Sequence, residues 1–156
     1  MERTLIILKP DAVQRGLVGR IVARFEAKGL KIVAMKMVQV SAELAERMYA
    51  EHKGKDFHQP LLEFITACPV VAAVLEGLDA VATVRKLIGP TFSPDAPAGT
   101  IRGDFGSSRR YNLIHGSDSA ESARREIGMF FQPAELNEYE LRISDWVYAR
   151  HLGKPL

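Results

Sequence analysis

The strongest constraint on the fold is that short β-branched runs alternate with helical stretches along the whole chain. Residues 4–8 form an apolar run that ends in Lys9 and Pro10, as a buried strand often does. Residues 17–28 carry apolar side chains at helical spacing before Gly29, a typical helix end. The same reasoning predicts strands at residues 4–8, 30–40, 70–76 and 112–115, and helices at residues 17–28, 41–51, 60–67, 80–88 and 119–131.

This order of elements indicates an α+β protein with a ferredoxin-like, four-stranded antiparallel sheet covered by helices. The chain has 156 residues, which suits one compact domain, and no repeat or linker divides it. We therefore expect a single domain over residues 1–156. Residues 89–99 contain three of the eight prolines and form a long loop, a kind of segment that is often functional. The tail carries Trp146, Val147 and Tyr148, and we expect these side chains to pack against the domain.

Composition narrows the possible functions. Hydrophobic residues make up 47% of the chain and charged residues 26%, which is typical of a globular protein and not of a disordered one. The net charge of +2 gives no general attraction to nucleic acid. Cys68 is the only cysteine, so an internal disulfide is impossible. No apolar run approaches the ~20 residues of a membrane helix, so we expect a cytoplasmic protein without a membrane partner.

Among the four histidines, His115 is the candidate for chemistry. It ends a predicted strand and precedes a polar run in which Asp118 or Ser119 caps the next helix. A strand end that leads into a helix N-terminus places an imidazole beside free backbone N–H groups, which favour phosphate. A neutral imidazole whose other nitrogen is held by an acceptor can act as a nucleophile, and Glu126 is a candidate acceptor. His52, His58 and His151 fall at positions that we expect to be exposed, without metal-ligand spacing.

Lys9, Arg85 and Arg102 are candidate phosphate-binding cations because they lie at a strand end or beside the long loop. The glycines at positions 99, 103 and 106 match neither the dinucleotide-binding pattern nor the P-loop pattern. A kinase of P-loop or protein-kinase design is therefore not indicated.

The run Asn-Leu-Ile-His-Gly-Ser-Asp-Ser at residues 112–119 resembles the active-site motif of the nucleoside diphosphate kinases, N-x-[IV]-H-G-S-D-S. The likeness extends over nearly the whole chain and includes TLIILKPDAV at residues 4–13, YAEHKG at 49–54 and GTIRGDF at 99–105. The resemblance implies a ferredoxin-like fold and transfer of the terminal phosphate from a nucleoside triphosphate to a nucleoside diphosphate through a phosphohistidine.

The resemblance also implies roles for individual residues. His115 is then the phosphorylated nucleophile, oriented by Ser117 and Glu126. Phe57, rather than the neighbouring His58, is the ring on which the base stacks. The groups that hold the phosphates and ribose are Lys9, Tyr49, Arg85, Thr91, Arg102 and Asn112. Magnesium is expected to arrive with the nucleotide, ATP and other nucleoside di- and triphosphates are the expected partners, and the expected assembly is a homohexamer, or else a homotetramer.

Some positions depart from the family pattern. Asp56-Phe57-His58 stands where Pro-Phe-Phe is usual, Phe92-Ser93 follows Thr91, and Arg109-Arg110-Tyr111 precedes Asn112. Two alternatives therefore remain. One is a catalytically silent nucleotide-binding or assembly module on the same fold. The other is a nucleic-acid-binding protein that uses the arginine pair, although such a pair is usually solvated and no specific nucleic acid is expected.

Overall fold

The computed structural model describes residues 1–151 and 154–155. Its centre is a four-stranded sheet in the order β2-β3-β1-β4, and neighbouring strands run antiparallel. The strands are β1 (Glu2–Leu8), β2 (Lys31–Val38), β3 (Val70–Gly77) and β4 (Ile114–Gly116). This strand order, with helices between the strands, is the ferredoxin-like α+β arrangement, so the predicted fold class is confirmed.

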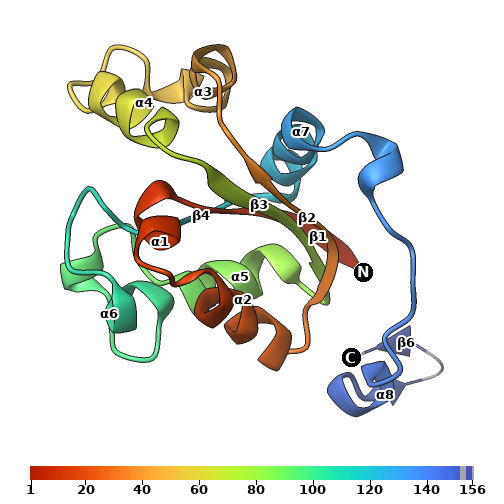
Figure 1. The fold of residues 1–156 in the computed structure, drawn as a ribbon. Coiled ribbons are helices and arrows are strands. Elements are labelled where there is room, and N and C mark those ends of the chain that lie inside the picture. Colours follow the sequence, from red (N-terminus) through yellow and green to blue (C-terminus); the bar gives the residue numbers. More distant parts are fainter. Residues whose placement is uncertain (152–153, 156) are drawn as a thin grey trace.

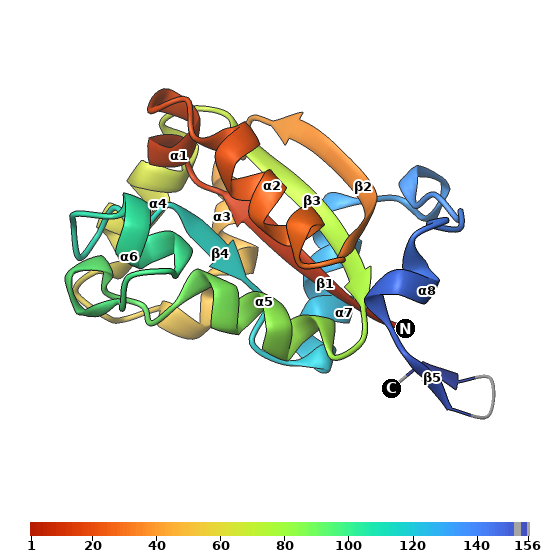
Figure 2. The same ribbon diagram turned by 90° about the horizontal axis from the view of Figure 1, so that it is seen from below.

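Helices cover both faces of the sheet. They are α1 (Pro10–Gln14), α2 (Val18–Ala27), α3 (Ala42–Met48), α4 (His58–Thr66), α5 (Ala80–Ile88), α6 (Ile101–Phe105), α7 (Ala120–Phe130) and α8 (Ser144–Val147). Short 3₁₀ turns add η1 (Ala50–His52), η2 (Ser93–Asp95) and η3 (Pro133–Glu135), and β5 (Arg150–His151) pairs with β6 (Lys154–Pro155). Figure 1 shows α3, α4 and α7 on one side of the sheet and α1, α2, α5 and α6 on the other. The second layer faces the viewer in Figure 2.

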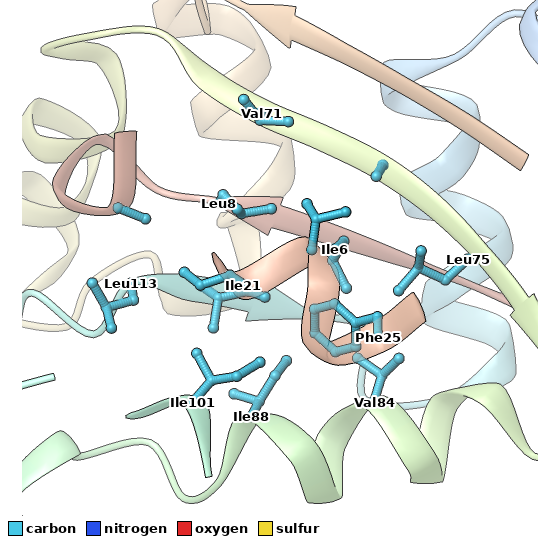
Figure 3. Close-up of a cluster of buried hydrophobic side chains, with 14 of the residues drawn as sticks. Ile6, Leu8, Ile21, Phe25, Val71, Leu75, Val84, Ile88, Ile101 and Leu113 are labelled. Carbon is cyan, nitrogen blue, oxygen red and sulfur yellow. The ribbon is translucent and has the colours of Figure 1, made fainter. Parts of the chain in front are cut away.

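The two helical layers explain why the central strands are apolar on both faces. Ile6 and Leu8 of β1 pack with α2 and α5, in the cluster drawn in Figure 3. Leu5 and Ile7 point the other way and pack with α3, α4 and α7. Because side chains alternate along a strand, a strand between two apolar layers has no polar face. The continuous run at residues 4–8 is thus the sequence of a central strand.

Several helices begin or end at the capping residues that the sequence indicated. Ser41 and Ser119 are the N-caps of α3 and α7, and their hydroxyls accept the backbone N–H of Leu44 and Ser122. Of the two caps that the sequence offered for α7, the structure therefore has Ser119. Gly29 adopts a φ of 89°, which ends α2 in the left-handed region that favours glycine.

Two short helices were not predicted, and two of the strands differ from the predicted pattern. The short helices α1 and α6 were not predicted, because five residues give too little periodicity to read. β4 begins at Ile114 and not at residue 112, because Leu113 has a φ of 69° and leaves the extended conformation. β2 contains an irregularity between Ile32 and Ala34, which breaks the alternation that the sequence suggested.

The C-terminal tail packs only in part. Tyr148 donates its hydroxyl to the carbonyl of Gly29 at 3.4 Å, and a Cβ added to Gly29 would lie 2.3 Å from Cγ1 of Val147. Trp146, in contrast, is 92% exposed, so the prediction that it packs on this chain is wrong. α8 is a single turn, and Val147, next to Trp146, is the residue that it packs against Gly29. In the described ranges, no helix has the length and apolar character to cross a membrane.

Candidate active site

His115 sits in the middle of β4, where it is paired with Ile7 of β1. Ile7 belongs to the apolar cluster on the α7 side of the sheet, and the flanking Ile114 belongs to the opposite cluster. Side chains directly opposite each other in an antiparallel pair share a face, so the imidazole of His115 points toward α7. Its side chain is 22% exposed, which leaves part of the ring accessible to a substrate.

Glu126 holds this ring from α7. Its Oε2 lies 2.8 Å from Nε2 of His115 and accepts the hydroxyl of Ser117 at 2.6 Å. Ala123, Glu126 and Phe130 form the buried stripe of α7, so the glutamate occupies a core-facing position and not a solvated one. A carboxylate can only accept, which places the hydrogen of a neutral imidazole on Nε2 and leaves the lone pair on Nδ1.

The charge of Glu126 is kept in spite of its burial. Burial alone would raise the pKa of this carboxyl group, but the hydrogen bond and charge of His115, together with the hydroxyl of Ser117, hold the pKa below its usual value. A buried negative charge beside Nε2 is the arrangement that stabilises positive charge on the imidazole. With Nε2 bound to Glu126, the nitrogen of His115 that is chemically able to act as a nucleophile is Nδ1.

Lys9 and Asn112 meet beside the start of β4. Nζ of Lys9 donates to Oδ1 of Asn112 at 2.7 Å, and Nδ2 of Asn112 donates to the carbonyl of Thr91 at 2.8 Å. Lys9 follows β1 directly and is only 7% exposed. Burial first, and then repulsion by Arg102, lowers the pKa of Lys9 to about 8. The ammonium group is therefore poorly neutralised by the protein.

Arg102 is 4% exposed and is surrounded by backbone carbonyls. Its Nε donates to Asn112 at 3.0 Å and its Nη2 to Ile114 at 2.6 Å. Its Nη1 donates to Gly89 and Pro90, both at 3.1 Å. Burial and repulsion by Arg85 lower the pKa of Arg102 to about 10. Arg85, on α5, reaches the carbonyl of Gly116 at 3.5 Å.

The aromatic candidates form a series of ring contacts that leads away from His115. Tyr49 meets the ring of His115 edge-on, with centroids 6.5 Å apart, and lies parallel to His52 at 6.2 Å. His52 meets Phe57 at 5.3 Å. Burial, with a smaller contribution from Glu126, raises the pKa of Tyr49, and its hydroxyl is buried without a hydrogen-bond partner among the described residues. Phe57 is 38% exposed at the start of α4.

Two histidines that were expected to be exposed are not. The side chain of His58 is 12% exposed and its Nε2 lies 3.9 Å from Glu46, and His52 is partly buried among Tyr49 and Phe57. His52 lies in the 3₁₀ turn at residues 50–52, and His58 begins α4, two residues before the predicted start of that helix at residue 60. The side chain of His151 lies outside the described part of the structure.

Two of the family departures, at residues 92–93 and 109–111, make contacts near the surface. The guanidinium of Arg109 lies 5.0 Å from the ring centroid of Phe92, and Tyr111 stacks on Phe64 with centroids 4.6 Å apart. Arg109 also lies 3.7 Å from Asp95. These contacts connect residues 109–111 to the long loop and to α4. Arg109 thus combines with an aromatic ring, a pairing that the sequence analysis did not anticipate.

Most of the predicted site residues converge on the chain segment from Asn112 to Ser117. The contacts described above connect this segment to Lys9, to side chains from α5, α6 and α7, and to the backbone of Thr91. Phe57 is connected to it only through the aromatic series. Asp11 was not predicted as a site residue, yet it accepts the N–H of Leu113 at 3.0 Å. Its place in the Lys-Pro-Asp run was the available signal. Over the described residues, no three His, Cys, Asp or Glu side chains group as metal ligands, and the charged groups at the segment suit phosphate.

Comparison with known proteins agrees with this geometry. A sequence model of the nucleoside diphosphate kinase family matches residues 2–136. The chain is 57% identical over 152 residues to a nucleoside diphosphate kinase of Pyrococcus horikoshii, covering 96% of each protein. It is 55% identical over 154 residues to one of Thermococcus kodakarensis, covering 97% of this chain and 88% of the relative.

A solved structure is similar as well. The chain superposes with a TM-score of 0.92 on a halophilic nucleoside diphosphate kinase from Halobacterium salinarum in complex with CDP. The two are 50% identical, and the match covers 94% of this chain and 98% of the other. Because the family model matches most of the chain and these relatives share its sequence and fold, this chain belongs to the nucleoside diphosphate kinase family of enzymes.

Proposed function

We propose that this enzyme transfers the terminal phosphate of a nucleoside triphosphate to a nucleoside diphosphate by a ping-pong mechanism through His115. The lone pair of Nδ1 attacks the terminal phosphorus, an N–P bond forms, and the bond to the bridging oxygen breaks. The diphosphate leaves, and a second diphosphate attacks the phosphorus with a terminal oxygen and breaks the N–P bond. The observation that carries the proposal is the 2.8 Å contact from Nε2 to Glu126, which leaves Nδ1 as the free nitrogen.

The phosphates are assigned to the cations around the segment from Asn112 to Ser117. Lys9 and Arg85 supply positive charge, and Thr91 supplies an exposed hydroxyl from the long loop. Arg102 can add one N–H, because four of its five donors already bind backbone carbonyls. The hydroxyl of Tyr49, which has no hydrogen-bond partner within residues 1–151 and 154–155, is a further donor that a phosphate or ribose oxygen can satisfy.

The base is assigned to the exposed ring of Phe57, and Asn112 is assigned to the ribose and phosphate end of the nucleotide. Stacking without hydrogen bonds to the base edge accepts every base, which suits a broad nucleotide range. The Halobacterium salinarum relative was solved with CDP, a nucleoside diphosphate, and we extend that ligand class to this chain. Magnesium, arriving with the nucleotide, neutralises part of the phosphate charge.

A labelling experiment tests the mechanism. The purified protein is incubated with ATP labelled in the γ-phosphate, and acid-labile, base-stable label is followed before and after addition of unlabelled CDP. We expect His115 to be labelled and CDP to remove the label as CTP. His115→Ala should abolish labelling while ADP still binds, and His58→Ala should keep it. Labelling at another residue, or direct transfer without a labelled protein, would contradict the ping-pong route.

The same experiment separates the alternatives. A catalytically silent module on this fold would bind nucleotides without taking up label. Against it, His115, Glu126 and Ser117 are connected by hydrogen bonds that a binding module does not need.

A hexamer or tetramer remains our prediction, supported by the apolar side chains of Met35, Met37 and Trp146 that this single chain exposes. Light scattering of the purified protein would distinguish the two assemblies from a monomer.

A further inference from the structure

The residue two positions before the proposed nucleophile has a strained backbone. Leu113 has a φ of 69° and is fully buried. A branched, non-glycine residue in this region costs ~1–3 kcal/mol and persists only where its surroundings fix it. The N–H of Ile114 donates to the carbonyl of Asn112 at 2.8 Å, so residues 112–114 form a tight three-residue turn. This turn leads directly into β4 and sets how His115 enters the sheet.

A small number of groups hold the turn from both sides. The carbonyl of Leu113 accepts the backbone N–H of Lys9 at 2.8 Å, and its own N–H donates to Oδ2 of Asp11 at 3.0 Å. Arg102 binds the flanking carbonyls of Asn112 and Ile114. Both backbone groups of Leu113 and both neighbouring carbonyls are therefore engaged. The left-handed conformation is fixed by these contacts and not by the preference of leucine.

Among the residues that the structure describes, Asp11 contributes the one side chain that hydrogen-bonds to Leu113 itself. It lies in the first turn of α1, directly after Pro10 at the first helical position. Its second oxygen, Oδ1, is buried and has no hydrogen-bond partner in the described ranges. A carboxylate with one oxygen unsatisfied is costly to bury. The N–H of Leu113 is the donor that binds this carboxylate in the described part of the chain.

We propose that Asp11 is a positioning residue for phosphoryl transfer, because its carboxylate holds the Leu113 turn and thereby fixes the direction from which His115 meets the phosphate. The proposal rests on the phosphohistidine mechanism above. β4 has only three residues, all paired with β1, so it has little independent means of keeping its register. A displacement of about 1 Å at a reacting atom can lower a rate ~10²-fold.

Two conservative variants separate the hydrogen bond from the negative charge, which also acts on Lys9 and Arg102. Asp11→Asn keeps an oxygen in the place of Oδ2 and removes the charge. Asp11→Glu keeps the charge and moves the oxygen by one methylene. Labelling by ATP in a single turnover is the assay, with the rate at saturation and the half-saturating ATP concentration both recorded. We expect the saturating rate of Asp11→Asn to stay within about threefold of wild type. The saturating rate of Asp11→Glu should fall by roughly 10- to 100-fold, while its half-saturating ATP concentration changes by less than about threefold.

Glu2 provides matched controls, because its Oε2 accepts the N–H of Val81 at 2.8 Å at the start of α5, away from His115. Glu2→Gln and Glu2→Asp should both label at the wild-type rate. Amide hydrogen exchange supplies a second measurement, in which the Leu113 amide should exchange slowly in wild type and Asp11→Asn and faster in Asp11→Glu.

The outcomes are distinguishable. Wild-type protein that takes up no label would refute the phosphohistidine mechanism and not the role of Asp11 alone. If wild type is active, an impaired Asp11→Asn overturns the proposal, because the charge would then matter more than the hydrogen-bond acceptor. This test remains available even if Asp11→Glu does not fold. An Asp11→Glu variant at the wild-type rate, or a slow variant whose Leu113 amide remains protected, overturns it as well.

Discussion

Replacing Glu126 with glutamine would remove the negative charge beside the imidazole while keeping its shape. Both hydrogen bonds of Glu126 end on the same oxygen, Oε2, so a glutamine oxygen in that place can still accept from Nε2 of His115 and from Ser117. The variant therefore changes a charge-assisted contact into a neutral one. The change in the labelling rate measures how much the negative charge of Glu126 stabilises positive charge on the imidazole ring.

The magnitude follows from typical hydrogen-bond energies. A bond to a charged group contributes ~1.5–3 kcal/mol and a neutral one ~0.5–1.5 kcal/mol, a difference of about 1–1.5 kcal/mol. Expressed as a rate, that difference is roughly 5- to 15-fold, because 1.4 kcal/mol corresponds to a factor of about ten. Glu126→Ala also removes the acceptor that orients the ring, and we expect the rate to fall ~10²-fold in that variant.

Single-turnover labelling by ATP measures this step without product release. Glu121→Gln is the matched control, since Glu121 lies in the first turn of the same helix and is exposed. The control should label at the wild-type rate. A Glu126→Gln variant that labels within twofold of wild type would refute the reasoning, because the charge would then contribute nothing to the phosphohistidine step.

Three further predictions concern substrate binding. Arg102→Ala should lower kcat/KM by roughly 10²-fold or more, and should also lower the free energy of unfolding because four carbonyls each lose a hydrogen bond. Phe57→Ala should weaken binding of ADP and CDP by ~1–3 kcal/mol in calorimetric titrations, whereas a larger loss in His58→Ala would move the base platform to His58. The fold lowers the pKa of Lys9 to about 8, so its positive charge is present below that pH and lost above it. ADP affinity should therefore fall as the pH rises from 8 to 10, and Lys9→Met should bind weakly without this pH dependence.

The sequence predicted the sheet well because burial on two faces leaves an unmistakable pattern. Continuous apolar runs identified β1 and β3, and side-chain caps such as Ser41 marked helix starts. The unpredicted parts have local causes that a one-dimensional pattern does not contain. Leu113 adopts a left-handed conformation that nothing in its own side chain favours, so the start of β4 was placed two residues early.

The candidate site was predicted mainly through the eight-residue motif and the resemblance that it supports. The residues alone made His115 a candidate nucleophile and Glu126 a candidate acceptor, but they did not show that the two side chains meet. Distances between them depend on how α7 returns across β1 and β4, which spacing along the chain does not determine. Asp11 was missed for a related reason, since its partner, Leu113, lies 102 positions further along the chain. The contact of Arg109 with Phe92 likewise requires two loops to meet.

The central position of β1 has a consequence for how tightly different parts of a nucleotide are held. This strand is hydrogen-bonded on both sides, to β3 and β4, and its residues 4–8 are fully buried, so its amides should open only with global unfolding. Lys9 follows it directly, whereas Phe57 stands at the start of a short surface helix. The phosphate end of a substrate would then meet the most rigid part of the molecule and the base a more compliant one. Such a difference in stiffness would permit purines and pyrimidines to be accommodated in turn while the reacting phosphorus stays in place.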